Sequence, residues 1–243
     1  ETIGPEVGEL CQGVVVLKII SNLAVHRLAR VTGVFTAKEL STSGDEDEGR
    51  SIINGILDAY AFAKADPFRA ATNNKGVMNA ISPIAVATGQ DWRAVEAGCH
   101  SYAAYKNGSV SPFVQWSRNS DGDLVGYIEM PAPVGLIGGA ARVHPCARAC
   151  VKLLGVKTAT ELGTVLAAAG IAQNLGALRA LATVGIQQGH MKLHAKNLAV
   201  QAGALSKEVD AVVARATASG RVTAASIKAA LDAERSGLPV PPQ

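Results

Sequence analysis

The alternation of apolar and polar residues along the chain predicts short strands among helices. Residues 13–20 (GVVVLKII) are mostly β-branched and bounded by polar or glycine residues, which predicts a buried strand, and residues 30–35 predict a second one. Residues 113–117 and 124–130 flank a turn centred on Asp121-Gly122, the pattern of a β-hairpin. Strands and helices do not alternate regularly, so we expect an α+β fold rather than a doubly wound parallel sheet.

Helical spacing of apolar residues fills most of the remaining chain. An acidic loop at residues 41–49 (STSGDEDEG) precedes the first long helix. Thr158 and Glu161 form a capping-box pattern that opens an Ala/Leu-rich stretch, which we interpret as a helix pair or as one long helix broken near Gly170. The other predicted helices span residues 52–63, 74–88, 91–104, 143–154, 206–218 and 223–234.

The composition describes a globular chain without a polyanionic partner. Of the 243 residues, 48% are hydrophobic and 18% charged, and the net charge is only +3, which excludes nucleic acid as the expected ligand. No apolar run approaches the roughly 20 residues of a membrane helix, so no membrane is expected. Four cysteines are too few for a disulfide scaffold, which favours free thiols in a reducing, cytoplasmic compartment. The chain opens on Glu1, so we expect the native start to lie upstream.

Lys75 and Asp91 are the first candidates for chemistry. Lys75 lies in the polar segment 72–76 (TNNKG), and Asp91 follows it by sixteen residues. We expect Lys75 near the start of one helix, with Asp91 brought close if that helix and the next form a hairpin. An ammonium beside a carboxylate stays protonated even in a cleft and stabilises a developing oxyanion. Two plainer interpretations stay open: Lys75 as a solvated surface cation, and Asp91 as the N-cap of its helix.

Several polar side chains are candidates for the same site. Arg69 carries a guanidinium that suits an anionic substrate group, and Asn79 shares the helical face of Lys75 one turn further on. Gln173 and Asn174 are adjacent amides inside an apolar helix, where buried amides need partners. These two amides therefore indicate a lined site.

Two histidines near the C-terminus allow either proton transfer or metal binding. His190 and His194 are four residues apart and share one face if their segment is helical. An imidazole whose ordinary pKa is near neutrality suits a general acid. A zinc hydrolase is the metal-based alternative, but no glutamate lies between the histidines and no third ligand is evident. His144, Cys146 and Cys150 lack a second cysteine pair, so we expect no metal site.

Four separated segments, taken together, resemble class II 3-hydroxy-3-methylglutaryl-coenzyme A (HMG-CoA) reductases. They are residues 69–79 (RAATNNKGVMN), 89–94 (GQDWRA), 172–180 (AQNLGALRA) and 189–195 (GHMKLHA). The similarity extends over nearly the whole chain and also includes residues 20–24 and 133–135.

The resemblance implies a division of the chain into three parts. Residues 1–36 are expected to end a small nicotinamide-binding domain, and residues 37–186 to form a large, mainly helical catalytic domain with an antiparallel hairpin. Residues 187–243 are expected to form a helical C-terminal flap. Family members assemble with active sites at subunit boundaries, so a homodimer or higher homo-oligomer is expected.

The resemblance also implies a reaction and roles for the candidate residues. The HMG-CoA thioester is reduced to mevalonate and free CoA with two NAD(P)H, or the reverse oxidation occurs. Lys75 is implied to stabilise the oxyanion, Asp91 to hold and tune Lys75, and His190 to protonate the departing CoA thiolate. The residues implied to contact the substrate or support Lys75 are Arg69, Asn79, Gln173 and Asn174, and Asn22 is implied to contact the cofactor. The segment that selects NAD or NADP is expected upstream, so both cofactors stay open.

Two segments typical of the family are not found in this sequence. One carries a catalytic glutamate, and the other is a dinucleotide-binding segment. We therefore interpret the chain as the C-terminal portion of a longer reductase, which alone should not turn over. The alternative is a non-catalytic CoA-ester-binding or assembly module.

Overall fold

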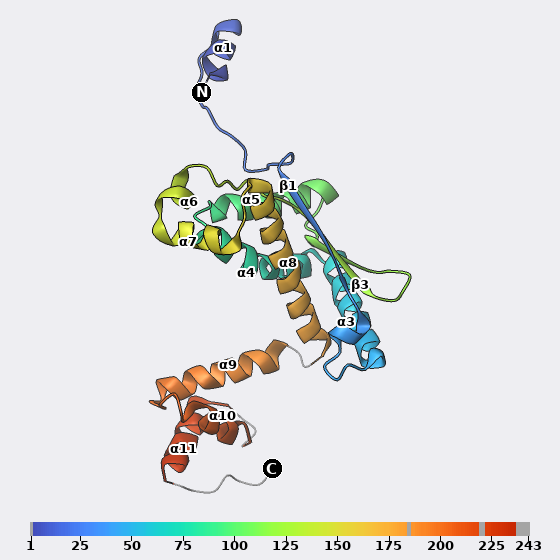
Figure 1. Cartoon of the computed structure of the whole chain (residues 1–243), viewed down its shortest axis with the longest axis vertical. Coiled ribbons are helices and arrows are strands. Elements are labelled where there is room, and N and C mark those ends of the chain that lie inside the picture. The colour runs from blue at the N-terminus through green and yellow to red at the C-terminus, as the bar shows by residue number, and fades with distance from the viewer. Residues whose placement is uncertain (1, 184–185, 219–221, 237–243) are drawn as a thin grey trace. The chain divides into compact units, whose positions relative to one another are not determined.

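The computed structural model describes residues 2–183, 186–218 and 222–236, with side chains described outside residues 184–193. The chain divides into two compact units, Glu1–Leu178 and Arg179–Gln243 (Figure 1). Each unit is described separately below. The domain limits expected after residues 36 and 186 stay a prediction.

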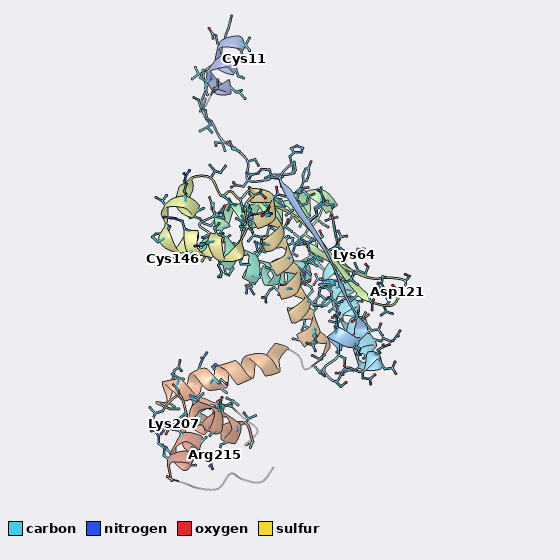
Figure 2. The ribbon with its side chains drawn as sticks, viewed as in Figure 1. Cys11, Lys64, Asp121, Cys146, Lys207 and Arg215 are labelled. Atoms are coloured by element: carbon cyan, nitrogen blue, oxygen red, sulfur yellow. The ribbon has the colours of Figure 1, made fainter. Side chains whose placement is uncertain are left out.

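The first unit contains an antiparallel sheet of three strands in the order β1-β3-β2. The strands are β1 (Leu28–Phe35), β2 (Val114–Arg118) and β3 (Leu124–Pro131). The predicted hairpin and the second predicted strand are confirmed. Asp121 lies at the tip of the hairpin (Figure 2), where Gly122 adopts a φ of 89° that suits glycine in a tight turn. Ile128 of β3 lies opposite Val31 of β1 on one side and opposite Val114 of β2 on the other. Ile128 is therefore in the middle of the sheet.

Helices make up most of the rest of the first unit, which confirms the α+β class. They are α1 (Ile3–Leu10), α2 (Ala37–Leu40), α3 (Glu46–Ala65), α4 (Pro67–Ala87), α5 (Trp92–Asn107), α6 (Gly139–Val143), α7 (Pro145–Leu154) and α8 (Ala159–Ala182), of which residues 179–182 belong to the second unit. The helix expected over residues 143–154 is confirmed as α7, which begins two residues later, and the short helix α6 before it was not predicted; the two are separated at His144-Pro145. The proline favours an extended backbone at the residue before it, so the helix is interrupted there.

The strand predicted at residues 13–20 is wrong. These residues form no strand, and they are exposed, with Val14 at 89% and Ile20 at 94% of their full accessible surface. A strand needs the backbone of a neighbour, and among the described residues only β1, β2 and β3 pair with one another. The apolar run therefore lies uncovered in this chain.

Helix α4 begins earlier than predicted. It starts at Pro67, after the N-cap Asp66, whose carboxylate accepts hydrogen bonds from the Phe68 and Arg69 amides at 3.2 and 3.1 Å. The polar segment that contains Lys75 is therefore in the interior of the helix, not at its start. Pro83 lies inside α4 without ending it.

Helix α8 runs without the break predicted near Gly170. A Cβ at Gly170 would lie 2.9 Å from Ile81 Cδ1 and 3.0 Å from Val77 Cγ1, so this glycine lets α8 pack closely on α4. Among the described residues, α8 is also the one helix long and apolar enough to cross a membrane, by length and composition only. Its Leu162 and Leu166 are fully buried in the first unit, as in a core helix.

The second unit is a small helical assembly. Its helices are α9 (Ile186–Gln201), α10 (Val209–Ala218) and α11 (Ala224–Arg235), and the last two confirm the amphipathic helices predicted there. Their shared core is made of Ala195, Ala199, Val212, Val213, Ala216, Ile227, Ala230 and Leu231. Arg215 of α10 pairs with Glu234 of α11 at 3.0 Å, and Figure 2 shows Arg215 in this unit.

Candidate active site

Helix α4 carries polar residues on two opposite faces. Lys75 and Asn79 are exposed, and their spacing of four residues places them on one outward face. Asn73 and Asn74 are buried, at 5% and 1% exposure, on the inward face. The segment therefore divides into side chains that face solvent and side chains that hold the helix in place.

Lys75 and Asp91 do not meet within one chain. Helices α4 and α5 form the expected hairpin, but Asp91 lies in the turn beyond Ala87, the last residue of α4. Twelve helical residues separate Lys75 from Ala87, which corresponds to about 18 Å along the axis. That separation exceeds the reach of both side chains. Among the described side chains, no hydrogen bond or ion pair joins Lys75 to Asp91, so the expected approach through the hairpin is wrong for a single chain.

Asp91 has the N-cap role that the sequence left open. Its Oδ1 accepts a hydrogen bond from the Ala94 amide at 3.1 Å at the start of α5, and its side chain is exposed. One carboxylate oxygen is thereby used for the helix. The other oxygen has no partner among the described residues and remains able to accept a hydrogen bond from a cation.

Asn174 belongs to a buried chain of hydrogen bonds. Trp116 Nε1 donates to Asn174 Oδ1 at 2.8 Å, and Asn174 Nδ2 donates to Asn73 Oδ1 at 2.9 Å. Asn174 is only 2% exposed, so this chain joins β2, α8 and α4 in the interior. Trp116 was missed in the sequence because an isolated tryptophan carries no local signal of its partner.

Asn74 extends the inward anchoring of α4. Its Nδ2 donates to the Ser111 carbonyl at 2.7 Å, and its Oδ1 accepts from the Phe113 amide at 3.0 Å. The two contacts tie α4 to the segment that leads into β2. The two residues that precede Lys75, Asn73 and Asn74, are therefore held by hydrogen bonds in the interior.

Three further candidates lie in the first unit. Arg69 is half-buried in the first turn of α4, and Gln173 is exposed on α8 beside the buried Asn174. Asn22 has an exposed side chain, and its backbone carbonyl lies 2.8 Å from the position that a Cβ would take on Gly98. Glycine at that position of α5 therefore permits the close approach of Asn22.

The side chain of His190 lies outside the described residues. Positions 190 and 194 both fall within α9, and His194 is exposed. Among the described residues, no group of three His, Cys, Asp or Glu side chains is arranged to hold a metal ion. The zinc interpretation therefore gains no support from the described part of the chain.

An ion cluster on β3 has a structural character. Glu129, only 12% exposed, accepts hydrogen bonds from Lys106 at 2.7 Å and Tyr102 at 2.8 Å, and it also pairs with Arg30 of β1. The hydrogen bonds from Lys106 and Tyr102 lower the pKa of Glu129 to about 2. Burial, followed by the bond to Glu129, raises the pKa of Tyr102 to about 12. The cluster ties α5 to two strands.

The family of the chain follows from comparison with known proteins. The model of the hydroxymethylglutaryl-coenzyme A reductase family matches residues 1–195, and the chain belongs to this family. It is 50% identical over 236 residues to 3-hydroxy-3-methylglutaryl-coenzyme A reductase of Archaeoglobus fulgidus, which covers 97% of the chain and 52% of that relative. It is 35% identical over 183 residues to a probable reductase of the same kind from Borreliella burgdorferi, covering 75% of the chain and 42% of that relative.

Solved structures agree with this family. The chain is 39% identical to a class II 3-hydroxy-3-methylglutaryl-CoA reductase from Streptococcus pneumoniae bound to NADPH in open conformations, with a TM-score of 0.70. That comparison covers 96% of the chain and 56% of the Streptococcus pneumoniae chain. The chain thus spans about half the length of the relatives it matches. The resemblance recognised in the four sequence segments is confirmed.

Proposed function

We propose that this chain forms part of an NAD(P)-dependent oxidoreductase that reduces the HMG-CoA thioester to mevalonate and free CoA, or catalyses the reverse oxidation. The match of the family to residues 1–195 carries the proposal. The exposed position of Lys75 on an anchored helix gives it a physical basis, because a fixed cation facing a substrate can stabilise negative charge.

The reaction consumes two reduced nicotinamides and two protons for each thioester. Bound NAD(P)H supplies the hydride in both reductions. In the first reduction the carbonyl oxygen of the thioester becomes an oxyanion, which Lys75 stabilises. Cleavage of the carbon–sulfur bond then leaves an aldehyde and the CoA thiolate, and His190 donates a proton to the sulfur. Lys75 polarises the aldehyde carbonyl in the second reduction, and the resulting alkoxide takes the second proton from solvent to give the mevalonate alcohol.

The cofactor is NAD or NADP, and Asn22 is the residue of this chain proposed to contact it. The exposed side-chain amide of Asn22 offers both a donor and an acceptor, which suits the carboxamide and ribose groups of a dinucleotide. The Streptococcus pneumoniae relative binds NADPH. Arg69, Asn79 and Gln173 are proposed to contact HMG-CoA or the Lys75 ammonium, whereas Asn174 supports the site from the interior.

The active unit is proposed to be a homodimer in which Lys75 of one copy meets Asp91 of the second. The separation of about 18 Å along α4 prevents the pair from forming within one chain. A two-fold axis would create the pair twice, once at each of two equivalent sites. Phe68 and Val86 lie seven residues before and eleven after Lys75 on the same outward face, with exposures of 84% and 57%, and such apolar surface favours association. The assembly is proposed to be cytoplasmic.

The experiment is an assay of the full-length protein. HMG-CoA should cause oxidation of NAD(P)H and release of free CoA thiol, with about two nicotinamides oxidised per thiol. Acetyl-CoA, which lacks the hydroxymethylglutaryl carboxylate, serves as the control thioester. Calorimetric binding of HMG-CoA without any nicotinamide oxidation would contradict the proposal and favour the non-catalytic CoA-ester-binding module.

A further inference from the structure

The turn between α4 and α5 is packed tightly against the start of α6. Gly89 in this turn has a φ of 70°, and a Cβ on it would lie 2.8 Å from the Ala141 amide nitrogen and 2.9 Å from the Ala140 carbonyl carbon. These neighbours are backbone atoms, which cannot move aside as a flexible side chain does. Glycine is therefore required at this position both for its conformation and for the close approach.

The side chain of Gln90 makes three hydrogen bonds in this turn. Its Oε1 accepts from the Gly135 amide at 2.8 Å, and its Nε2 donates to the Gly135 carbonyl at 2.9 Å. The same Nε2 also donates to the Thr88 carbonyl at 2.9 Å. The Gln90 side-chain amide thus binds both the N–H and the carbonyl of Gly135, as the backbone of a neighbouring strand would.

The segment around Gly135 is held from a second direction as well. Arg27 donates from Nη2 to the Val134 carbonyl at 2.7 Å, and Val134 itself is buried at 2% exposure. Beyond Gly135 the chain becomes exposed, with Ile137 at 94%, and Gly138 has a φ of 82°. Gln90 therefore binds the last anchored residue before an exposed glycine-rich loop.

We infer that Gln90 is a positioning residue, which fixes the backbone of Asp91 relative to Gly135 and the loop that leads from it into α6. This inference rests on the proposed function, in which Asp91 is presented to Lys75 of a second copy. Asp91 follows Gln90 directly and is exposed, with one carboxylate oxygen already bound to the Ala94 amide. Because a displacement of about 1 Å can cost up to about 100-fold in rate, the pairing of Gln90 with Gly135 matters for the presentation of Asp91.

The first test replaces Gln90 with methionine in the full-length enzyme. Gln90→Met keeps the side-chain length but removes all three hydrogen bonds, and exchange of the Gly135 amide hydrogen should become faster. The expected kcat is about 10- to 100-fold below wild type, with KM for HMG-CoA changed by less than about threefold. Gln115→Met is the matched control, since Gln115 is exposed on β2 and makes no side-chain hydrogen bond among the described residues; its kcat should equal that of wild type.

The second test uses Gln90→Glu, which nearly preserves the shape. An ionised carboxylate can only accept hydrogen bonds, so it repels the Gly135 carbonyl, but a protonated carboxyl can donate to that carbonyl and accept from the Gly135 amide. The ratio of Gln90→Glu activity to wild-type activity should therefore rise as the pH is lowered. The corresponding ratio for Gln90→Met should stay constant, because methionine has no proton to gain.

The outcomes separate this inference from the proposed function. Full kcat in Gln90→Met, in an enzyme that loses activity on Asp91→Asn, would overturn the positioning role and leave the proposed function standing. A flat activity ratio for Gln90→Glu across the pH range would also overturn it. A full-length wild-type protein without HMG-CoA-dependent oxidation would overturn the proposed function, and the inference with it.

Discussion

The outward and inward faces of α4 carry similar polar residues with opposite environments. Lys75 and Asn79 face outward and are exposed, whereas Asn73 and Asn74 face inward and are almost fully buried. The inward amides are bound by partners from α8 and from the segment before β2. Polar residues in one short sequence segment thus separate into an exposed group, for which we propose binding and catalysis, and a buried group that holds the structure.

Mutations on the two faces of α4 should therefore differ in whether they change activity or stability. Substitution on the outward face should remove activity and leave stability unchanged, because no buried partner is left without a hydrogen bond. Substitution on the inward face should lower the free energy of unfolding, because a buried donor or acceptor loses its partner. Activity then falls only as a consequence.

The largest expected effect is the loss of activity in Lys75→Ala. In the full-length enzyme, kcat should fall by about 10²- to 10³-fold, the usual range for loss of a group that stabilises an oxyanion. The thermal midpoint should stay within about 2 °C of wild type, since Lys75 is exposed. Lys64→Ala is the control, because Lys64 is an exposed lysine on α3 (Figure 2). A Lys75→Ala enzyme with wild-type kcat would contradict the catalytic role of the outward face.

The next effect is the destabilisation in Asn174→Leu. This change leaves Trp116 Nε1 and Asn73 Oδ1 without their partners in the interior, so the free energy of unfolding should fall by about 3 kcal/mol. Denaturant unfolding of the full-length protein measures it. Gln173→Leu, at the exposed neighbour on α8, should change stability by less than about 0.5 kcal/mol. Equal stability of the two variants would show that the buried hydrogen bonds of Asn174 with Trp116 and Asn73 do not stabilise the fold.

Glu129→Gln should have a smaller effect that depends on pH. The pKa of Glu129 is about 2 in the fold against an ordinary value of 4.5, so the ionised form stabilises the fold above pH 4.5 and this contribution is lost as the pH falls toward 2. At pH 7 the variant should be less stable by about 2 kcal/mol. This value is smaller than the pKa shift alone would give, because solvent screens the interactions of Glu129 with the exposed Lys106 and Arg30. Unfolding measured at several pH values should show the two proteins converging near pH 2. A difference independent of pH would contradict the assignment.

The smallest expected effect is the difference in stability between Gly170→Ala and Gly176→Ala, two substitutions on α8. Gly170→Ala places a methyl group against Ile81 and Val77 on the inward side of α4, which should cost about 1 to 2 kcal/mol of stability. Gly176→Ala meets no atom within 4 Å and should stabilise the helix by up to about 1 kcal/mol. Thermal unfolding of both variants measures the contrast. Identical shifts would mean that α8 and α4 do not pack closely at Gly170.

Much of the fold could be predicted because its signals are local. Helical spacing and the Asp-Gly turn lie within short segments, so the hairpin and most helices were found. The strand expected at residues 13–20 was wrong because a strand depends on a neighbour distant in sequence. The start of α4 was misplaced although Asp66 and Pro67 are a standard N-terminal pattern, because the polar segment after them was interpreted as the boundary.

The site was harder to predict because its partners are far apart in the sequence. Asn174 and Asn73 are 101 residues apart, and Gln90 and Gly135 are 45 apart, so no local pattern indicates either pairing. The sequence grouped Asn174 with Lys75 as one set of polar candidates. In the structure Asn174 is buried and has a structural role, whereas Lys75 is exposed, as the proposed chemical role requires.

Subunit mixing tests the pairing of Lys75 with Asp91 most directly. Inactive full-length Lys75→Ala and Asp91→Asn enzymes are mixed in equal amounts under conditions that allow subunit exchange, and HMG-CoA-dependent NAD(P)H oxidation is measured. If the pair forms between two copies, half of the dimers gain one intact site, and activity should recover to about a quarter of the wild-type value. If the mixture stays as inactive as its components, the two residues do not act together across the subunit boundary.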